Sequence, residues 1–194
     1  MADDRITPDE ALRELLAGNE RFVSGQRSHP HQDAERRASL VQGQRPFAVI
    51  FGCSDSRLAA EIIFDRGLGD LFVVRTAGHI LGSEVLASIE YGVRVLGASL
   101  LVVLGHDSCG AVQAAHDVIT GAAPRTPATA AIVDRVASSL ALAAREGVSD
   151  LDEVSTVHVR HTVADLAAAL HPGDDFRVVG LAYRLAEGRV TVVA

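Results

Sequence analysis

Three features are absent or scarce in this sequence of 194 residues: long apolar runs, clusters of basic residues and cysteine. No apolar run is long enough to span a bilayer, and Met1 is followed by polar residues instead of the basic and apolar regions of a secretory signal. The 18 Lys and Arg residues are scattered and outnumbered by 25 Asp and Glu residues, so a phosphate backbone would be repelled. We expect a cytoplasmic protein that binds neither membranes nor nucleic acid.

Only two cysteines are present, Cys53 and Cys109. They could pair in one disulfide, but an intracellular chain of this length, 48% hydrophobic, buries a full core without that bridge and lies where it would not persist. Interdomain linkers, internal repeats and low-complexity tracts are also absent from the sequence. The sequence therefore predicts a single domain over residues 1–194, and it leaves the two cysteines to be explained by another chemistry.

The hydrophobic pattern predicts an α/β fold, with a mostly parallel central sheet flanked by helices. Continuous apolar runs of strand length, which suit strands covered on both faces, occur at residues 47–51, 71–74, 99–104 and 177–181. Helical patterns lie between or beside them, at residues 83–96, 111–119, 128–145 and 163–170. This alternation of strand and helix is typical of a parallel sheet.

An N-terminal helical arm precedes the first apolar run. Thr7 and Glu10 form a capping-box pattern with Pro8 at the first helical position, and leucines follow at helical spacing as far as Gly25. A second short helix is expected at residues 34–41. We expect the arm, residues 1–45, to pack on a partner subunit.

Chemically active side chains follow two of the apolar runs. The first run leads into Cys53, Asp55 and Arg57, and the third leads into His106 and Cys109. In a parallel sheet both loops leave the carboxyl ends of strands, where ligand sites form. Two thiolates and an imidazole suit zinc, and three protein ligands leave the fourth tetrahedral position for water, a reactant or another side chain. Each cysteine taken singly is also a common core residue, but the placement of both on strand-end loops favours a metal site.

Two motifs carry a resemblance to a known family: Cys-Ser-Asp-Ser-Arg at residues 53–57 and Gly-His-Asp-Ser-Cys-Gly at residues 105–110. Together they resemble the beta carbonic anhydrases in their bacterial form. The likeness extends over most of the chain, through residues 64–75, 88–91 and 180–183 among others.

The resemblance implies an enzyme that reversibly hydrates carbon dioxide to bicarbonate and a proton. By that resemblance Cys53, His106 and Cys109 bind one zinc ion per chain, and Asp55 with Arg57 forms the catalytic pair that orients a zinc-bound hydroxide. Zinc lowers the pKa of its bound water to about 7, so hydroxide is available near neutral pH. The alternative for Asp55 and Arg57 is a surface ion pair, which would contribute little.

The resemblance also implies substrate-binding positions and an oligomer. Gln44, Phe72 and Tyr91 match residues that contact carbon dioxide or line its pocket in the family, with the tyrosine supplied by the neighbouring subunit. A homodimer or a dimer of dimers is therefore expected. Gln44 is equally well explained as a turn residue, and Phe72 as part of the core.

Family members differ in the fourth zinc ligand, which is either water or the aspartate equivalent to Asp55. The closed members carry an accessory pocket of Trp, Arg and Tyr; here Arg75 and Tyr183 match two of these, but Ile50 stands at the Trp position. We therefore expect the open type, like the plant enzymes, in which Asp55 pairs with Arg57 at alkaline pH. Asp55 remains a candidate fourth ligand in a closed state at lower pH.

The histidines outside the zinc motif give weaker indications of a functional role. His79 stands where the family usually has Asn, and it is either a proton shuttle or, as a lone histidine more commonly is, structural. The rest are expected at solvated positions or helix ends: His29, His31, His116, His158, His161 and His171.

Three rival functions follow from the same residues. One is hydrolysis of carbon disulfide or carbonyl sulfide on the same metal scaffold. A second is a noncatalytic module that binds zinc or bicarbonate, with Asp55 as a permanent ligand. The third is a thiol redox protein that uses Cys53 and Cys109, although redox pairs usually show Cys-x-x-Cys spacing.

Overall fold

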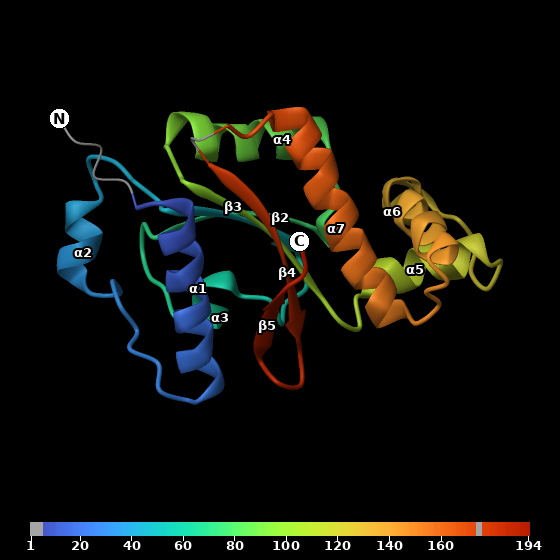
Figure 1. The fold of residues 1–194 in the computed structure, drawn as a ribbon, viewed down its shortest axis with the longest axis horizontal. Coiled ribbons are helices and arrows are strands. Elements are labelled where there is room, and N and C mark those ends of the chain that lie inside the picture. Colours follow the sequence, from blue (N-terminus) through green and yellow to red (C-terminus); the bar gives the residue numbers. More distant parts are fainter. Residues whose placement is uncertain (1–5, 174–175) are drawn as a thin grey trace.

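In the part of the chain that the structure describes, five strands form one sheet in the order β2-β1-β3-β4-β5 (Figure 1). The computed structural model describes residues 6–173 and 176–194, and its strands are β1 (Ala48–Cys53), β2 (Leu71–Thr76), β3 (Leu100–His106), β4 (Arg177–Arg184) and β5 (Arg189–Val192). The first four strands are parallel to their neighbours, and β5 pairs with β4 in the antiparallel direction. The α/β class and the mostly parallel sheet are confirmed. The short β5 was not predicted, because only Val190 of its four residues is buried.

The two central strands are buried along their whole length, which explains their unbroken apolar sequence. Side chains alternate between the faces of the sheet. Ile50 and Val102 pack into the core on one face, whereas Phe51 and Val103 pack into the core on the other. Figure 1 shows α1 and α3 on one side of the sheet and α4 with α7 on the other, with α5 and α6 beyond α7.

Over residues 6–173 and 176–194 the structure has seven α-helices, together with a 3₁₀ turn at Ala77–His79 and a π-helical turn at Tyr91–Val95. The helices are α1 (Pro8–Val23), α2 (Ala34–Ser39), α3 (Ala60–Ile63), α4 (Ser83–Glu90), α5 (Gly110–Ile119), α6 (Pro127–Arg145) and α7 (Leu151–Leu170). Among the described residues, no helix has both the length and the apolar character needed to cross a membrane.

Helix α7 is more than twice as long as the helix predicted at residues 163–170. Its first half buries five of six consecutive residues, from Val154 to Val159, because it packs against β3, β4, α5 and α6. A helix covered on several sides has no single apolar stripe, so its periodicity is weak in the sequence. The four-residue α3 was missed because it is shorter than any periodic pattern can reveal.

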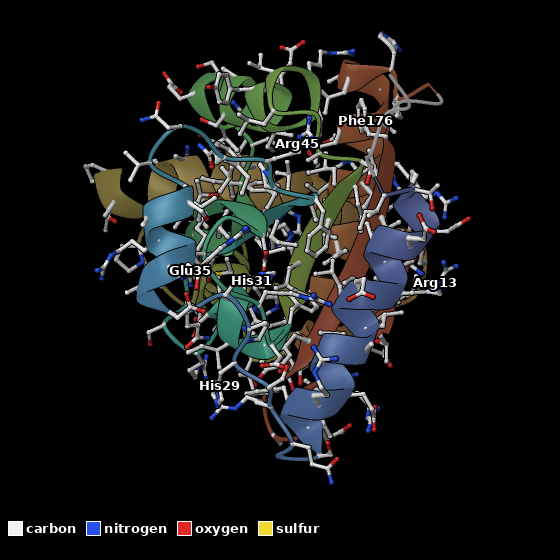
Figure 2. The ribbon with its side chains drawn as sticks, turned by 90° about the vertical axis from the view of Figure 1, so that its left-hand side faces the viewer. Arg13, His29, His31, Glu35, Arg45 and Phe176 are labelled. Atoms are coloured by element: carbon white, nitrogen blue, oxygen red, sulfur yellow. The ribbon has the colours of Figure 1, made fainter. Side chains whose placement is uncertain are left out.

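The N-terminal arm is held to the body of its own chain. The capping box of Thr7 and Glu10 is present, and α1 buries Ala11 and Leu15 in the core. In Figure 2, α1 (beside Arg13) and α2 (beside Glu35) lie on opposite sides of the view, with the segment that carries His29 and His31 between them. Residues 1–5 of the predicted arm lie outside the described residues, and packing of the arm on a partner stays a prediction.

A buried carboxylate anchors the segment that follows α1. Asp65 accepts hydrogen bonds from Arg21 Nε at 2.6 Å, from the backbone N–H of Ser28 at 3.0 Å and its hydroxyl at 2.9 Å, and from the backbone N–H of His29 at 3.0 Å. Burial raises the pKa of Asp65, but these donors outweigh burial and hold the pKa well below its usual range. The carboxylate therefore stays charged and ties the arm to the loop between α3 and β2.

Candidate metal centre

The carboxyl ends of β1 and β3 bring together the three predicted metal ligands. Cys53 ends β1, His106 ends the neighbouring β3, and Cys109 immediately precedes α5. Their sulfur and imidazole nitrogen atoms lie within 4.8 Å of one another, and all three residues are buried. This juxtaposition was expected from the strand ends, and three donor atoms this close together can bind one metal ion.

The imidazole of His106 is oriented for a metal. Its Nδ1 lies 2.7 Å from the carbonyl oxygen of Asp107, which can only accept, so Nδ1 carries the hydrogen. Its Nε2 is buried and finds no hydrogen-bond partner among the described residues. A buried acceptor left unpaired is costly in a native protein. A metal ion bound between Nε2 and the two sulfurs satisfies that acceptor.

The two thiols are electrostatically linked. The neighbouring Cys109 thiol lowers the pKa of Cys53 to about 4, with a further contribution from the backbone N–H of Gly78. The same pairing, together with burial, raises the pKa of Cys109. A metal ion that takes both sulfurs as thiolates must therefore displace the proton of Cys109. Both cysteines are free of disulfides.

Asp55 and Arg57 form a forked ion pair beside the cluster. Arg57 donates to Asp55 through Nε at 2.9 Å, through a terminal guanidinium nitrogen at 2.7 Å and through its backbone N–H at 2.9 Å. The hydrogen bond from Arg57 holds the pKa of Asp55 well below its usual range. A carboxylate oxygen of Asp55 lies 4.0 Å from Nε2 of His106, the nitrogen that faces the two sulfurs. The pair therefore places a charged, oriented carboxylate at the edge of the metal cluster.

Arg75 fixes the backbone that carries Cys53 and Asp55. It donates to the carbonyl of Cys53 at 3.0 Å and to the carbonyl of Asp55 at 2.6 Å. The hollow beside Arg75 and Ile50 has no room for a water molecule. The sequence indicated Arg75 only as a match to the arginine of the family's accessory pocket. Nothing in its local sequence indicates its hydrogen bonds to the carbonyls of Cys53 and Asp55.

The predicted substrate-binding residues lie away from the cluster of their own chain. Phe72 pairs with Val49, four residues before Cys53, which corresponds to about 13 Å along the strand. The Tyr91 ring lies 6.2 Å from the Phe72 ring, centroid to centroid, and is 47% exposed. Gln44 is exposed and precedes the amino end of β1. The fold of one chain therefore does not assemble these three residues with the metal ligands.

The prediction for His158 is wrong. It is only 4% exposed, in the middle of α7, where it donates from Nε2 to the carbonyl of Gly78 at 2.9 Å. His79 is also buried, and its ring packs on that of His158 with centroids 4.3 Å apart. Burial, then the neighbouring His158 and His106, lower the pKa of His79 well below its ordinary value, so it stays neutral. The error arose because α7 was expected to begin after His158, whereas His171 does lie at the end of that helix.

Comparison with known proteins agrees with this site. The profile of the family described as carbonic anhydrase matches residues 48–190. Carbonic anhydrase 2 of Mycobacterium tuberculosis is 51% identical over 191 residues, which cover 95% of this chain and 92% of that protein. The carbonic anhydrase of Mycolicibacterium smegmatis is 52% identical over 190 residues, covering 94% and 92%.

A solved structure agrees with the sequence relatives. The beta-carbonic anhydrase CcaA superposes with a TM-score of 0.71 at 26% identity, over 93% of this chain and 94% of that chain. The family profile spans the four parallel strands, β1 to β4, and all three residues of the metal cluster. The chain thus belongs to the beta class of the carbonic anhydrase family.

Proposed function

We propose that this protein is a zinc-dependent carbonic anhydrase that interconverts carbon dioxide and bicarbonate. The observation that carries the proposal is the buried cluster of Cys53, His106 and Cys109 with the Asp55–Arg57 pair at its edge. Two thiolates and one imidazole match the preference of zinc, and three ligands leave one position open. When bound there, zinc supplies a Lewis acid that lowers the pKa of a water ligand to about 7.

Asp55 is proposed to accept a hydrogen bond from the reacting water. It stays ionised at neutral pH because Arg57 holds its pKa low, and an ionised carboxylate can only accept. Its orientation is set by three hydrogen bonds from Arg57, and Arg57 is itself steadied by a hydrogen bond to the carbonyl of Ser108 at 3.3 Å. With Asp55 engaged in this way, we propose the open type of site, in which the carboxylate is not a metal ligand.

The substrate pocket is proposed to be completed by a second subunit. Phe72 lies on an edge strand, β2, and Tyr91 begins the π-helical turn that follows α4, where Val95 is 66% exposed. An apolar edge of this kind is suited to pairing with another copy of the chain. We propose a homodimer, alone or as a dimer of dimers, in which Gln44, Phe72 and Tyr91 face the metal cluster of the neighbour. Relatives of the same fold include a beta-carbonic anhydrase described as tetrameric, which is 22% identical to this chain.

We also propose a cytoplasmic location, since the cytosol keeps thiols such as Cys53 and Cys109 reduced and able to bind metal.

The test is metal analysis coupled to a pH-indicator assay of carbon dioxide hydration on the purified protein. We expect one zinc per chain and hydration that is abolished by a chelator and restored by zinc. A second arm offers carbon disulfide as substrate. Stoichiometric zinc without hydration activity would reject the proposed function, and turnover of carbon disulfide alone would reassign the site to that hydrolysis.

A further inference from the structure

A chain of hydrogen bonds leads from the sulfur of Cys53 to the outer part of α7. The backbone N–H of Gly78 donates to Cys53 Sγ at 3.3 Å, and the carbonyl of Gly78 accepts from Nε2 of His158 at 2.9 Å. Nδ1 of His158 lies 2.8 Å from the hydroxyl of Ser139, and Nδ1 of His161 lies 2.9 Å from the same hydroxyl. Residues of α6 and α7 are thus linked, through Gly78, to Cys53, one of the three candidate metal ligands.

The direction of each bond follows from donor and acceptor chemistry, which assigns the tautomers. The Gly78 carbonyl can only accept, so Nε2 of His158 carries the hydrogen. Burial lowers the pKa of His158, which favours the neutral ring with Nδ1 as an acceptor for the Ser139 hydroxyl. The oxygen of Ser139 then accepts from Nδ1 of His161. Every donor in this series of hydrogen bonds has an acceptor, so the ring of His158 is held in one orientation.

Gly78 needs such support because its backbone conformation is unusual. Its φ of 66° is left-handed, and a Cβ atom there would lie 2.7 Å from the side chain of Ala111, two residues after Cys109. Glycine alone fits this place, yet glycine is also the residue with the greatest conformational freedom. The bond from His158 to its carbonyl, and the packing of His79 on His158, restrain the conformation in which the N–H of Gly78 points at Cys53.

We propose that His158 is a positioning residue for the metal centre: it holds Gly78 so that a backbone N–H is directed at the sulfur of Cys53. The inference rests on the proposed function, in which Cys53 is a metal ligand. Hydrogen bonds to a ligating sulfur orient it and withdraw part of its charge, so they tune the metal. The relevant donor here is a backbone group, and the side chain that fixes it lies 80 residues further along the chain.

Three variants separate positioning from general stability. His158→Gln retains an N–H donor near the position of Nε2, whereas His158→Leu keeps a similar volume without any donor. His161→Leu is the matched control, because His161 lies on the same helix and contacts the same Ser139 but is not bonded to Gly78. The measurements are zinc affinity by competition with a coloured chelator and the thiolate-to-cobalt charge-transfer band of the Co²⁺-loaded protein. Urea unfolding of each metal-free variant reports stability separately.

We expect His158→Leu to bind zinc 10- to 100-fold more weakly, the range typical of lost outer-shell partners, and to shift the charge-transfer band. His158→Gln and His161→Leu should keep the wild-type affinity and band. The inference is overturned if His158→Leu is folded with unchanged affinity and band, or if either of the other variants weakens zinc binding equally. Should His158→Leu not fold, Ser139→Ala takes its place: a shifted band supports the inference and an unchanged band overturns it. A wild-type protein that binds no metal would instead reject the proposed function itself.

Discussion

Replacement of Arg57 tests whether this residue serves catalysis, by orienting Asp55, without contributing to metal binding. Arg57→Ala removes two of the three hydrogen bonds that hold Asp55, those from Nε and from the terminal nitrogen, and leaves only the backbone N–H. The side chain of Arg57 is 52% exposed, so water takes the place of the guanidinium and keeps Asp55 solvated. The expected effect is therefore loss of orientation, at the upper end of the 10- to 100-fold range found for outer-shell partners.

The assay is the initial rate of carbon dioxide hydration between pH 6 and pH 9, with metal content measured on the same samples. Zinc should remain stoichiometric, because Arg57 contacts no atom of Cys53, His106 or Cys109 through a hydrogen bond among the described residues. Without Arg57 the pKa of Asp55 rises toward its ordinary value of about 4, so the carboxylate stays ionised over this whole pH range. The rate deficit should accordingly be independent of pH.

Arg57→Lys is the matched control. Lysine keeps the positive charge but offers a point contact in place of the planar fork, so its rate should lie between those of the wild type and Arg57→Ala. Two results would refute the reasoning. If the deficit of Arg57→Ala disappeared at high pH, Arg57 would act on protonation and not on orientation, and if zinc were lost with the side chain, Arg57 would be part of the support of the metal.

Four further outcomes are expected. Cys109→Ser should lose stoichiometric zinc in metal analysis, and full retention would remove Cys109 from the ligand set. Asp65→Ala should lower the free energy of unfolding by about 3 kcal/mol at pH 7, as loss of a buried paired carboxylate does. Because the pKa of Asp65 is lower when folded, that contribution is present above pH ~4 and fades as pH falls further, so urea titrations of variant and wild type should converge in acid. Gly78→Ala should lower both stability and zinc affinity, since the added methyl group meets Ala111 in a left-handed conformation; wild-type values for both would contradict the tight contact. Sedimentation equilibrium should report a dimer or a dimer of dimers, and a monomer with full activity would contradict the role proposed for Tyr91.

The local sequence was sufficient to predict the four parallel strands and the residues of the metal cluster. Unbroken apolar runs mark strands that are buried on both faces, and the two central runs became β1 and β3. The sequence places Cys53 and His106 at the carboxyl ends of two strands, and the structure makes these strands parallel neighbours, so the two residues meet there. The capping box at Thr7 and the helix of residues 128–145 were readable for the same reason, since each depends on a few adjacent residues.

Only the tertiary structure decided the surroundings of that cluster. His158 is fixed by a carbonyl 80 residues away, Arg75 by the carbonyls of Cys53 and Asp55, and Tyr91 by its place beside an edge strand. None of these contacts has a sequence period or a neighbouring motif, because they depend on how helices and strands pack across the sheet. Burial along a strand is a property of a short segment, which a sequence displays directly; the order of the strands and the partner of a buried polar side chain are properties of the whole packed core.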